Sequence, residues 1–486
     1  MSRSAHIVDM IFFWARAEPH RLALIQPELV TSFQGLADAI ESISERIDRL
    51  ELDSSEPVAI SIASPSYYLA AIFALLRCGF TVAPVNPPLF PHLRSAGIRN
   101  LIYDTHGQVL SGGRNIRFDA SWLPAETSPA SRKPHRDRPG GNGDMILFTS
   151  GTTGRPKAAR QAMNGVVQRY NSPLSCANGD FSKALILPGL AGGFGFNRAC
   201  EILYSGKTAC FAPFGETALS LISTFGIEAL VASTQHVLSL ADLQAGADRY
   251  DLSSLKVLKI GGALLSPAAA RRVKTNLCRN IIMSYASTEA GTAAIAPYDM
   301  IADIPGAVGF LSPEAEVQIV DSTGAVLPVG AEGIIRVRTP QIVSNLASGA
   351  AAQADSSSEW FYPGDIGRVT EAGVLCLAGR YSDVINRGGH KVSATKIEEV
   401  LEALPQIKEA AACGVQGPSE LEEIWIAVVA QSPVDVSEIK RHLREHHDLG
   451  LDVDEVIEVS TLPRNDTGKV QKHLLKETLL RLKKGS

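Results

Sequence analysis

The segment 148–157 combines the residue types that bind phosphate. It is Phe-Thr-Ser-Gly-Thr-Thr-Gly-Arg-Pro-Lys, and it follows an apolar run, 145–147, that is typical of a buried strand ending at a turn. Glycines let the backbone approach anionic oxygens, N–H groups and hydroxyls donate hydrogen bonds to them, and Arg155 and Lys157 neutralise their charge. A flexible surface loop is the alternative, but it does not need this order of residue types. The segment therefore predicts a phosphate-binding loop. It is not a Walker loop, because Ala158 follows the lysine.

Two downstream segments carry groups suited to a nucleotide and its metal ion. Residues 285–289, Tyr-Ala-Ser-Thr-Glu, place a carboxylate beside hydroxyls. Mg²⁺ bound to ATP prefers one or two carboxylates plus phosphate oxygens, although Ser-Thr-Glu by itself is also typical of a helix N-terminus. Residues 261–263, Gly-Gly-Ala, follow the run Leu-Lys-Ile of a predicted strand. Such small side chains let a flat base or substrate lie against the backbone.

Two segments nearer the C-terminus carry a further carboxylate and a further lysine. Residues 360–365, Trp-Phe-Tyr-Pro-Gly-Asp, end in a carboxylate that can accept hydrogen bonds from both hydroxyls of a ribose, and Arg380 follows about fifteen residues later. An ordinary Gly-Asp turn is the alternative. Residues 462–469, Leu-Pro-Arg-Asn-Asp-Thr-Gly-Lys, place a lysine on a glycine-bearing turn, for which a surface loop is the alternative.

The five segments resemble those of the adenylate-forming superfamily, both in their order along the chain and in their approximate spacing. This superfamily contains acyl-CoA synthetases, peptide-synthetase adenylation domains and luciferases, and the chain is most similar to carboxylic acid–CoA ligases. The resemblance covers nearly the whole chain. It implies an AMP-forming acid–thiol ligase that uses ATP, Mg²⁺ and coenzyme A.

The resemblance also implies a role for each matching residue. Thr288 contacts the α-phosphate, Glu289 binds Mg²⁺, and Lys469 stabilises the charge that develops during adenylation. Gly388 and Gly389 line the pantetheine tunnel. The implied nucleotide and phosphate contacts are Thr149, Ser150, Gly151, Thr152, Thr153, Gly154, Lys157, Gly262, Ala263, Tyr285, Asp365 and Arg380.

Two half-reactions follow from the resemblance, and with them two domains joined by a hinge. A carboxylate first attacks ATP to give an acyl-adenylate and pyrophosphate, and a thiol then attacks the adenylate. We expect an α/β fold with a large N-terminal region of layered subdomains at 1–379, a hinge at 380–382, and a small mobile α+β domain at 383–486 that carries Lys469. Ser382 stands at the hinge where relatives have Asp or Lys, and Lys396 replaces a usual Glu; no role is assigned to either departure.

The acyl site is expected to be apolar. Ala191 stands where relatives usually have a His, and Phe196-Asn197-Arg198 lacks the Asp that holds an α-amino group in peptide-synthetase domains. An aromatic or medium-chain apolar acid is therefore the predicted substrate. The alternative is a stand-alone enzyme that loads a carrier protein's phosphopantetheine thiol, and a nucleotide-binding regulator with decayed catalysis is a third reading. The expected acyl-site residues are Phe194, Phe196, His236, Gly261 and Ala286.

Bulk properties exclude some classes of function. The net charge of −5 does not indicate a nucleic-acid partner, and no apolar run is long enough for a membrane span. The seven cysteines stand singly, which favours reduced thiols over metal or disulfide sites. We therefore expect a cytoplasmic enzyme whose partners are a small-molecule carboxylic acid and either CoA or a carrier protein.

Overall fold

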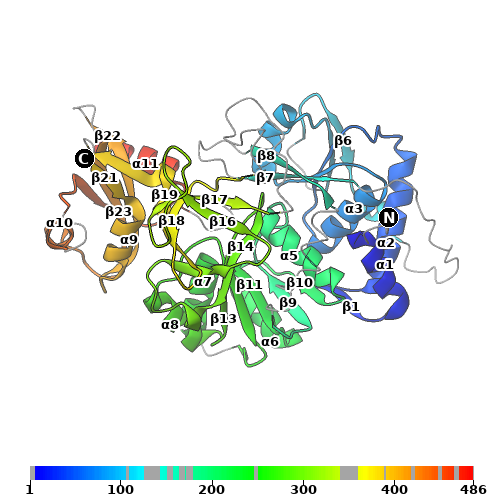
Figure 1. The fold of residues 1–486 in the computed structure, drawn as a ribbon. Helices are drawn as coiled ribbons and strands as arrows, with labels where there is room; N and C mark the ends of the chain where they lie inside the picture. The colour runs from blue at the N-terminus through cyan, green and yellow to red at the C-terminus, as the bar shows by residue number, and fades with distance from the viewer. Residues whose placement is uncertain are drawn as a thin grey trace.

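In the computed structural model, the chain forms two large sheets with helices on their faces, followed by a smaller C-terminal part (Figure 1). The described residues are 6–104, 109–124, 143–149, 157–163, 170, 179–245, 250–339, 360–387, 390–417, 422–446, 451–464 and 470–484. Within these ranges no helix is both long enough and apolar enough to cross a bilayer.

A six-stranded sheet forms the first layer, and its strand order is β6-β5-β3-β4-β7-β8. All neighbouring pairs are parallel except β7 and β8, which are antiparallel. The strands are β3 (Val58–Ser61), β4 (Val82–Pro84), β5 (Asn100–Tyr103), β6 (Arg114–Arg117), β7 (Met145–Thr149) and β8 (Lys157–Gln161). Helices and short 3-10 turns surround them: α1 (Ile7–Ala17), α2 (Phe33–Arg49), α3 (Pro65–Arg77), η1 (Pro87–His92), η2 (Arg94–Ala96) and η3 (Ala120–Trp122).

A thirteen-stranded sheet forms the second layer, in the order β16-β17-β18-β19-β15-β14-β13-β12-β11-β9-β10-β1-β2. Its central strands are parallel, whereas β13 to β19 pair in antiparallel fashion. The strands are β1 (Leu22–Gln26), β2 (Leu29–Ser32), β9 (Lys183–Ile186), β10 (Thr208–Cys210), β11 (Ala229–Ser233), β12 (Val257–Gly261), β13 (Ile281–Ser287), β14 (Gly291–Pro297), β15 (Ala307–Leu311), β16 (Glu316–Val320), β17 (Gly333–Arg338), β18 (Asp365–Val369) and β19 (Val374–Arg380). Its helices and turns are α5 (Gly193–Tyr204), α6 (Glu216–Phe225), α7 (Thr234–Ala245), α8 (Pro267–Asn276), η5 (Tyr298–Met300) and η6 (Tyr381–Asp383).

The C-terminal part has its own small sheet and its own apolar core. Strands β22, β23 and β24 form the sheet, and β20 pairs with β21 as a separate hairpin. Ile397 and Leu401 of α9 pack with Ile426 of β23 in this core. The elements are β20 (Val384–Arg387), β21 (His390–Ser393), α9 (Ala394–Glu402), β22 (Ile407–Gln416), β23 (Glu422–Ala430), α10 (Val436–Glu445), β24 (Glu455–Glu458) and α11 (Lys472–Lys484). The predicted fold class, a large α/β region followed by a small α+β part, is confirmed.

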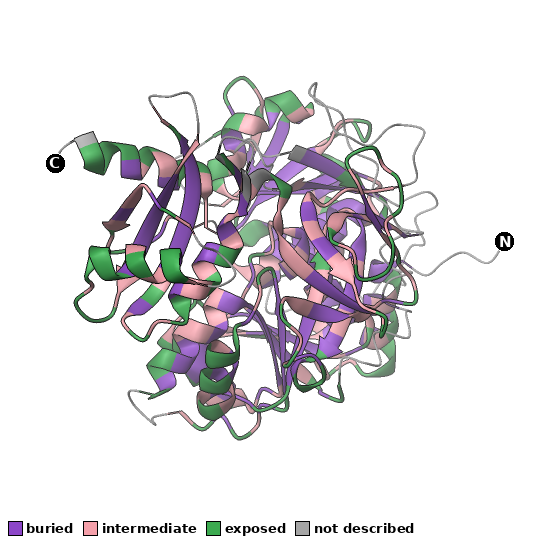
Figure 2. Ribbon diagram, turned by 60° about the vertical axis from the view of Figure 1, so that its left-hand side comes forward, coloured by how far each residue is buried: buried purple, intermediate pink, exposed green. Residues whose placement is uncertain are grey.

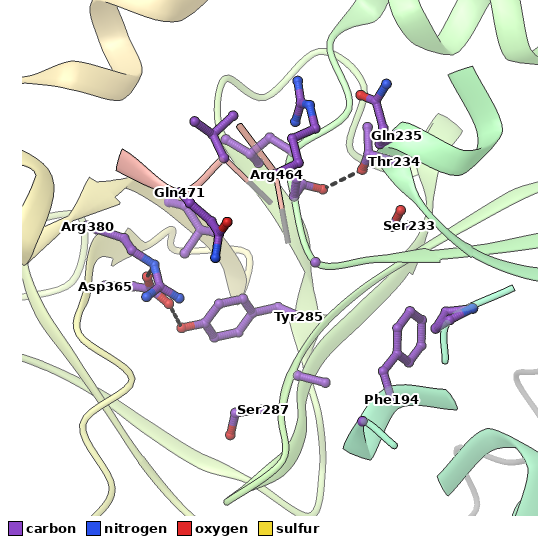
Figure 3. A pocket seen from close by; sticks show the side chains of 18 of the residues that line it. Phe194, Ser233, Thr234, Gln235, Tyr285, Ser287, Asp365, Arg380, Arg464 and Gln471 are labelled. Atoms are coloured by element: carbon purple, nitrogen blue, oxygen red, sulfur yellow. Dashed lines mark hydrogen bonds and ion pairs between the residues drawn. The ribbon is translucent and has the colours of Figure 1, made fainter. Parts of the chain in front are cut away.

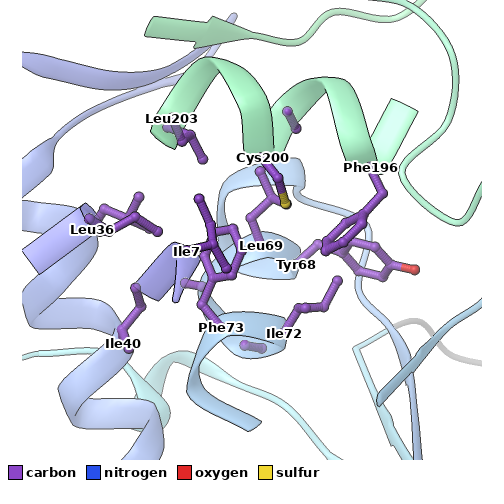
Figure 4. Close-up of a cluster of buried hydrophobic side chains, with 14 of the residues drawn as sticks. Ile7, Leu36, Ile40, Tyr68, Leu69, Ile72, Phe73, Phe196, Cys200 and Leu203 are labelled. Atoms are coloured by element: carbon purple, nitrogen blue, oxygen red, sulfur yellow. The ribbon is translucent and has the colours of Figure 1, made fainter. Parts of the chain in front are cut away.

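The buried face of α2 follows from its apolar periodicity. Leu36, Ile40, Ile43 and Ile47 recur at helical spacing, and all four are buried. They pack against α3 and α5 in the largest apolar cluster (Figure 4). Figure 2 shows the general result, with buried strands and helices that expose only their outer faces. Six cysteines are free in the part of the chain that the structure describes, and Cys176 lies outside it.

Lys259 is an ionisable side chain that lies in the protein core. Lys259 of β12 is only 8% exposed, and its ammonium lies 5.1 Å from the ring centroid of Phe181. Burial lowers the pKa of Lys259 to about 7, although the carboxylate of Glu201 acts in the opposite direction. Glu201 itself forms an ion pair with Arg198 at 2.6 Å. The lysine therefore carries an incompletely compensated charge in the interior.

We expect Lys259→Met to stabilise the protein most at low pH. The pKa of Lys259 is lower in the folded state than in the unfolded chain, so the unfolded chain binds more protons between about pH 7 and pH 10. The wild type therefore gains stability as pH rises through this window, and below it bears the full cost of the buried charge. The variant should gain up to about 4 kcal/mol at pH 6 and progressively less toward pH 9. Urea denaturation of both proteins across this range measures the difference.

Lys256→Met is the matched control for this prediction. Lys256 precedes the same strand but is exposed, and its ion pair with Glu228 raises its pKa. Its replacement should not reproduce the gain at low pH. A gain from Lys259→Met that is equal at pH 6 and pH 9 would show that packing, and not charge, is responsible.

Candidate active site

A cleft of about 2550 Å³ lies where the second sheet meets the C-terminal part. Strands β11, β12 and β13 are parallel, so their carboxyl ends meet at one edge of the sheet, where ligands of such sheets bind. Residues at or just beyond these ends line the cleft, among them Ser233, Gly262 and Tyr285. The volume exceeds the ~300–1,000 Å³ of ordinary ligand pockets. It leaves room for a nucleotide together with a second substrate.

Asp365 is held on the cleft by two partners from distant parts of the chain (Figure 3). The hydroxyl of Tyr285 donates to its Oδ2 at 2.5 Å, and Arg380 Nε lies 3.2 Å from its Oδ1. Pairing of β18 with β19 places Asp365 directly opposite Arg380. Gly364, with φ of 81°, supplies the left-handed turn that precedes the strand. Burial and the adjacent carboxylate raise the pKa of Tyr285 well above its usual value, so its phenol remains a donor.

This arrangement leaves acceptor capacity on both oxygens of Asp365. A carboxylate offers about four lone-pair positions, and Tyr285 and Arg380 occupy one on each oxygen. As far as the described residues go, one position per oxygen therefore remains for a ligand. Two adjacent hydroxyls, as in a ribose, match this pair of acceptors.

The small residues of the site permit close packing. A Cβ atom on Gly193 would lie 2.6 Å from Oγ1 of Thr288, so only glycine fits between α5 and this hydroxyl. Gly261 lies behind Phe194, because a Cβ there would be 3.4 Å from the Cζ atom of that ring. Ala263 is held by its carbonyl oxygen, which accepts a hydrogen bond from Thr234 Oγ1 at 3.0 Å.

The structure brings most of the described candidates together. Phe194, Gly262, Ala263, Tyr285, Ala286, Thr288, Glu289, Asp365 and Arg380 all line the cleft. Magnesium fits this set as a nucleotide-bound ion. The described residues form no cluster of three or more potential metal ligands, and Mg²⁺ on a nucleotide needs only one or two carboxylates beside the phosphates. Glu289 is the carboxylate suited to that position.

Three of the expected acyl-site residues, Phe196, His236 and Gly261, are not among the described residues that line the cleft. Phe196 is fully buried in the main apolar core between α5, α2 and α3 (Figure 4). Residues two apart on a helix point to nearly opposite sides. Of the two phenylalanine rings, α5 can therefore direct only that of Phe194 into the cleft. His236 does not belong to the described lining either. Its Nδ1 accepts a hydrogen bond from the N–H of Ser233 at 3.4 Å, and its ring lies 5.1 Å from that of Phe214.

Several expected residues lie outside the described part of the chain. They are Ser150, Gly151, Thr152, Thr153, Gly154, Gly388, Gly389 and Lys469, together with the side chains of Thr149 and Lys157. Their neighbours are described. The backbones of Thr149 and Lys157 pair opposite each other at the ends of β7 and β8, and Phe148 lines the cleft. Arg464 and Val470 pair in the same way and also line the cleft.

Sequence reasoning missed one wall of the cleft. Ser233, Thr234, Gln235 and Leu238 line it, at the end of β11 and the start of α7. The signal was present, because a buried apolar strand that ends in hydroxyl residues marks the carboxyl edge of a parallel sheet. The C-terminal residues Glu398, Gln471 and Lys472 were missed because no local pattern distinguishes them from surface residues.

Comparisons with known proteins agree with this geometry. The family model described as AMP-binding enzyme matches residues 11–346, and the model for the AMP-binding enzyme C-terminal domain matches 396–469. The salicyl-AMP ligase / salicyl-S-ArCP synthetase of Mycobacterium tuberculosis is 29% identical, covering 95% of this chain and 88% of that protein. The 2-succinylbenzoate–CoA ligase of Bacillus licheniformis is 26% identical, with coverage of 95% and 98%.

A solved structure shows the same fold. The O-succinylbenzoate coenzyme A synthetase of Bacillus subtilis, in complex with ATP and magnesium ion, superimposes with a TM-score of 0.81 at 20% identity. The alignment covers 96% of this chain and 99% of that one. The resemblance to adenylate-forming enzymes is thereby confirmed, and the chain belongs to the AMP-binding enzyme family.

Proposed function

We propose that the protein is an ATP-dependent carboxylic acid–CoA ligase that works through an acyl-adenylate. The observation that carries the proposal is the arrangement of Asp365, Tyr285 and Arg380, which leaves two acceptor positions for a ribose diol on a cleft that also receives Thr288 and Glu289. The family match and the ligase names of its relatives support the same chemistry.

The reaction requires two anions to meet, so the enzyme's task is alignment and neutralisation. An oxygen of the acid attacks the α-phosphorus, and the bond to pyrophosphate breaks. A thiol sulfur then attacks the acyl carbon, the C–S bond forms, AMP leaves, and the thiol loses its proton. Asp365 and Tyr285 would hold the nucleoside, Thr288 would donate to the α-phosphate, and Glu289 would hold Mg²⁺, whose charge would neutralise that of the phosphates. Residues of the 149–157 loop would bind the phosphates, and Lys469 would stabilise the charge that develops during adenylation.

An aromatic or medium-chain apolar acid is the proposed substrate. Phe194 presents its ring beside the backbone of Gly261, and Leu190, Ala191 and Leu238 also line the cleft. A flat or apolar acyl group would bury its surface against this wall. The proposed partners are therefore this acid and CoA. We also propose a reducing compartment such as the cytoplasm, because the six cysteines in the described part of the chain are free thiols.

Loading of a carrier protein's phosphopantetheine thiol is the second candidate. It is supported by the printed name of the 29% identical relative, which pairs a salicyl-AMP ligase with a salicyl-S-ArCP synthetase. Both candidates share the adenylation step and differ only in the thiol that follows.

Acid-dependent pyrophosphate release tests the proposal. The purified protein is assayed with ATP and Mg²⁺ against aromatic, fatty, dicarboxylic and amino acids, with CoA, with a phosphopantetheinylated carrier protein, and with neither. Release with an apolar acid that CoA accelerates, together with an acyl-CoA product, supports the ligase. Acceleration by the carrier alone supports the second candidate, and no release with any acid contradicts both.

The proposed hinge comprises residues 380–382, between domains at 1–379 and 383–486. Supporting this boundary, β19 ends at Arg380, the 3-10 turn η6 covers Tyr381–Asp383, and a separate apolar core begins at Ile385. In the present arrangement Ser393 Oγ donates to the carbonyl oxygen of Ala378 at 2.9 Å across the boundary.

Ser382→Pro should slow thioester formation more than adenylation. Proline restricts backbone rotation at the position about which the C-terminal part would turn between the half-reactions. We expect the second half-reaction, measured in single turnover from supplied acyl-adenylate, to slow about tenfold or more, with pyrophosphate exchange within about threefold of the wild type. An equal loss in both would indicate misfolding and remove the support for this hinge.

A further inference from the structure

The segments on either side of 465–469 form two paired arms, 463–464 and 470–472. Arg464 and Val470 make an antiparallel bridge, and the N–H of Gln471 donates to the carbonyl oxygen of Pro463 at 2.8 Å. Arg464, Val470, Gln471 and Lys472 all line the cleft. Figure 3 shows Arg464 and Gln471 at the same opening as Asp365 and Arg380. Both arms are therefore part of the cleft wall.

The first arm is tied to the C-terminal sheet by an ion pair. Arg464 Nη2 donates to Glu409 Oε2 on β22 at 2.7 Å, and the two side chains are 25% and 20% exposed. These partners are 55 residues apart in the chain. A charge-assisted hydrogen bond with limited exposure is stronger than a surface ion pair and has a defined direction.

The second arm is tied to α9 by a lysine with several partners. Lys472 Nζ donates to Glu398 Oε1 at 2.7 Å and to the carbonyl oxygen of Ala412 at 2.8 Å, and it lies 3.8 Å from Asp383 Oδ2. Glu398 Oε1 also accepts the N–H of Ala412 at 2.8 Å. Burial raises the pKa of Glu398, and the ammonium of Lys472 opposes this shift. The arm is thus joined to both α9 and β22.

We propose that Glu409 and Glu398 are positioning residues for the first half-reaction. Through Arg464 and Lys472 they hold the two arms against the cleft, and the segment between the arms contains Lys469. This inference rests on the proposed function, which assigns that lysine to adenylation. Neither glutamate contacts the reacting atoms, so each acts through the arm that it holds.

The position of the two ion pairs in the chain predicts which half-reaction depends on them. Glu398, Glu409, Arg464 and Lys472 all follow the proposed hinge in the chain, and so does Asp383. If the C-terminal part turns about residue 382, both ion pairs turn with it and remain intact. Loss of either pair would then disturb the arms and the step that uses them, and leave the thiol step unaffected.

Glu409→Gln and Lys472→Met test the proposal in the full-length protein. We expect acid-dependent ATP–pyrophosphate exchange to fall about 10- to 100-fold in kcat, because small misplacements of a catalytic group have effects of this size. Thioester formation from supplied acyl-adenylate should stay within about twofold of the wild type. The exchanged pair Glu409→Arg with Arg464→Glu should recover part of the loss. Lys483→Met is the control, because Lys483 lies on the same helix and pairs with Glu455, away from the arms.

A second measurement needs no substrate. Hydrogen exchange followed by mass spectrometry should show faster exchange at the Gln471 amide in Glu409→Gln than in the wild type, since this amide donates to Pro463. Unchanged exchange at Gln471 with unchanged adenylation overturns the inference, as does an equal loss of both half-reactions in a folded variant. If the wild type adenylates no acid, the proposed function fails, and the Gln471 amide alone decides whether the glutamates hold the arms.

Discussion

Replacing Lys469 with alanine is expected to abolish adenylation while sparing the second half-reaction. Lys469 lies outside the described residues, but Arg464 and Val470 on either side of it pair with each other and line the cleft that holds Asp365. An ammonium directed at a developing negative charge contributes a few kcal/mol, so its loss should reduce the rate of acyl-adenylate formation about 10²- to 10³-fold. ATP–pyrophosphate exchange with the preferred acid measures this step.

Supplied acyl-adenylate separates the two roles that Lys469 can have. With this compound and the thiol substrate, the Lys469→Ala variant should form thioester at nearly the wild-type rate. Lys483→Ala, at an exposed site on α11, should leave both rates unchanged. Equal loss of both half-reactions in the Lys469 variant would assign the lysine to folding or to the thiol step.

Asp365→Asn should cause the largest loss of ATP binding among variants of the described residues. The amide keeps the shape but removes the negative charge, and its NH₂ group cannot accept a hydrogen bond. Arg380 loses its charged partner and Tyr285 loses a charged acceptor. A buried donor left without its partner costs about 1–3 kcal/mol, and ribose contacts are lost in addition. We expect kcat/KM for ATP to fall about 10²-fold or more, mostly through KM.

Tyr285→Phe is the matched control for this variant. It removes the same hydrogen bond from the other side and keeps the aromatic ring and the Asp365–Arg380 ion pair. Its kcat/KM for ATP should change less than about tenfold. Thermal unfolding of both variants checks that the fold is intact. If Asp365→Asn alters KM for the acid and leaves KM for ATP unchanged, Asp365 does not hold the nucleotide.

Some features of the site were visible in the sequence because their chemistry lies in consecutive residues. The run 148–157 and the segment 285–289 contain their functional groups within a few positions, so neither required knowledge of distant neighbours. The same holds for the buried face of α2, because helical spacing alone brings Leu36, Ile40, Ile43 and Ile47 to one side. Local signals also predict the change from the large region to the small one near Arg380, where we propose the hinge.

Other features depend on contacts between residues that are far apart in the chain. Tyr285 and Asp365 are 80 residues apart, on strands β13 and β18 that three other strands separate within one sheet, so only the folded sheet lets the phenol reach the carboxylate. Phe194 and Phe196 are equivalent in sequence terms, but the rotation of α5 sends one ring into the cleft and the other into the core.

The sequence by itself determined the family, the fold class and the residue types proposed to bind phosphate, ribose and metal, since each depends on local order. Only the tertiary structure decided which side chains reach the cleft and which glutamates hold Arg464 and Lys472. The physical reason is that the direction of a side chain follows from helix rotation and strand register. Both are settled by packing over the whole molecule, and a short stretch of sequence does not contain them.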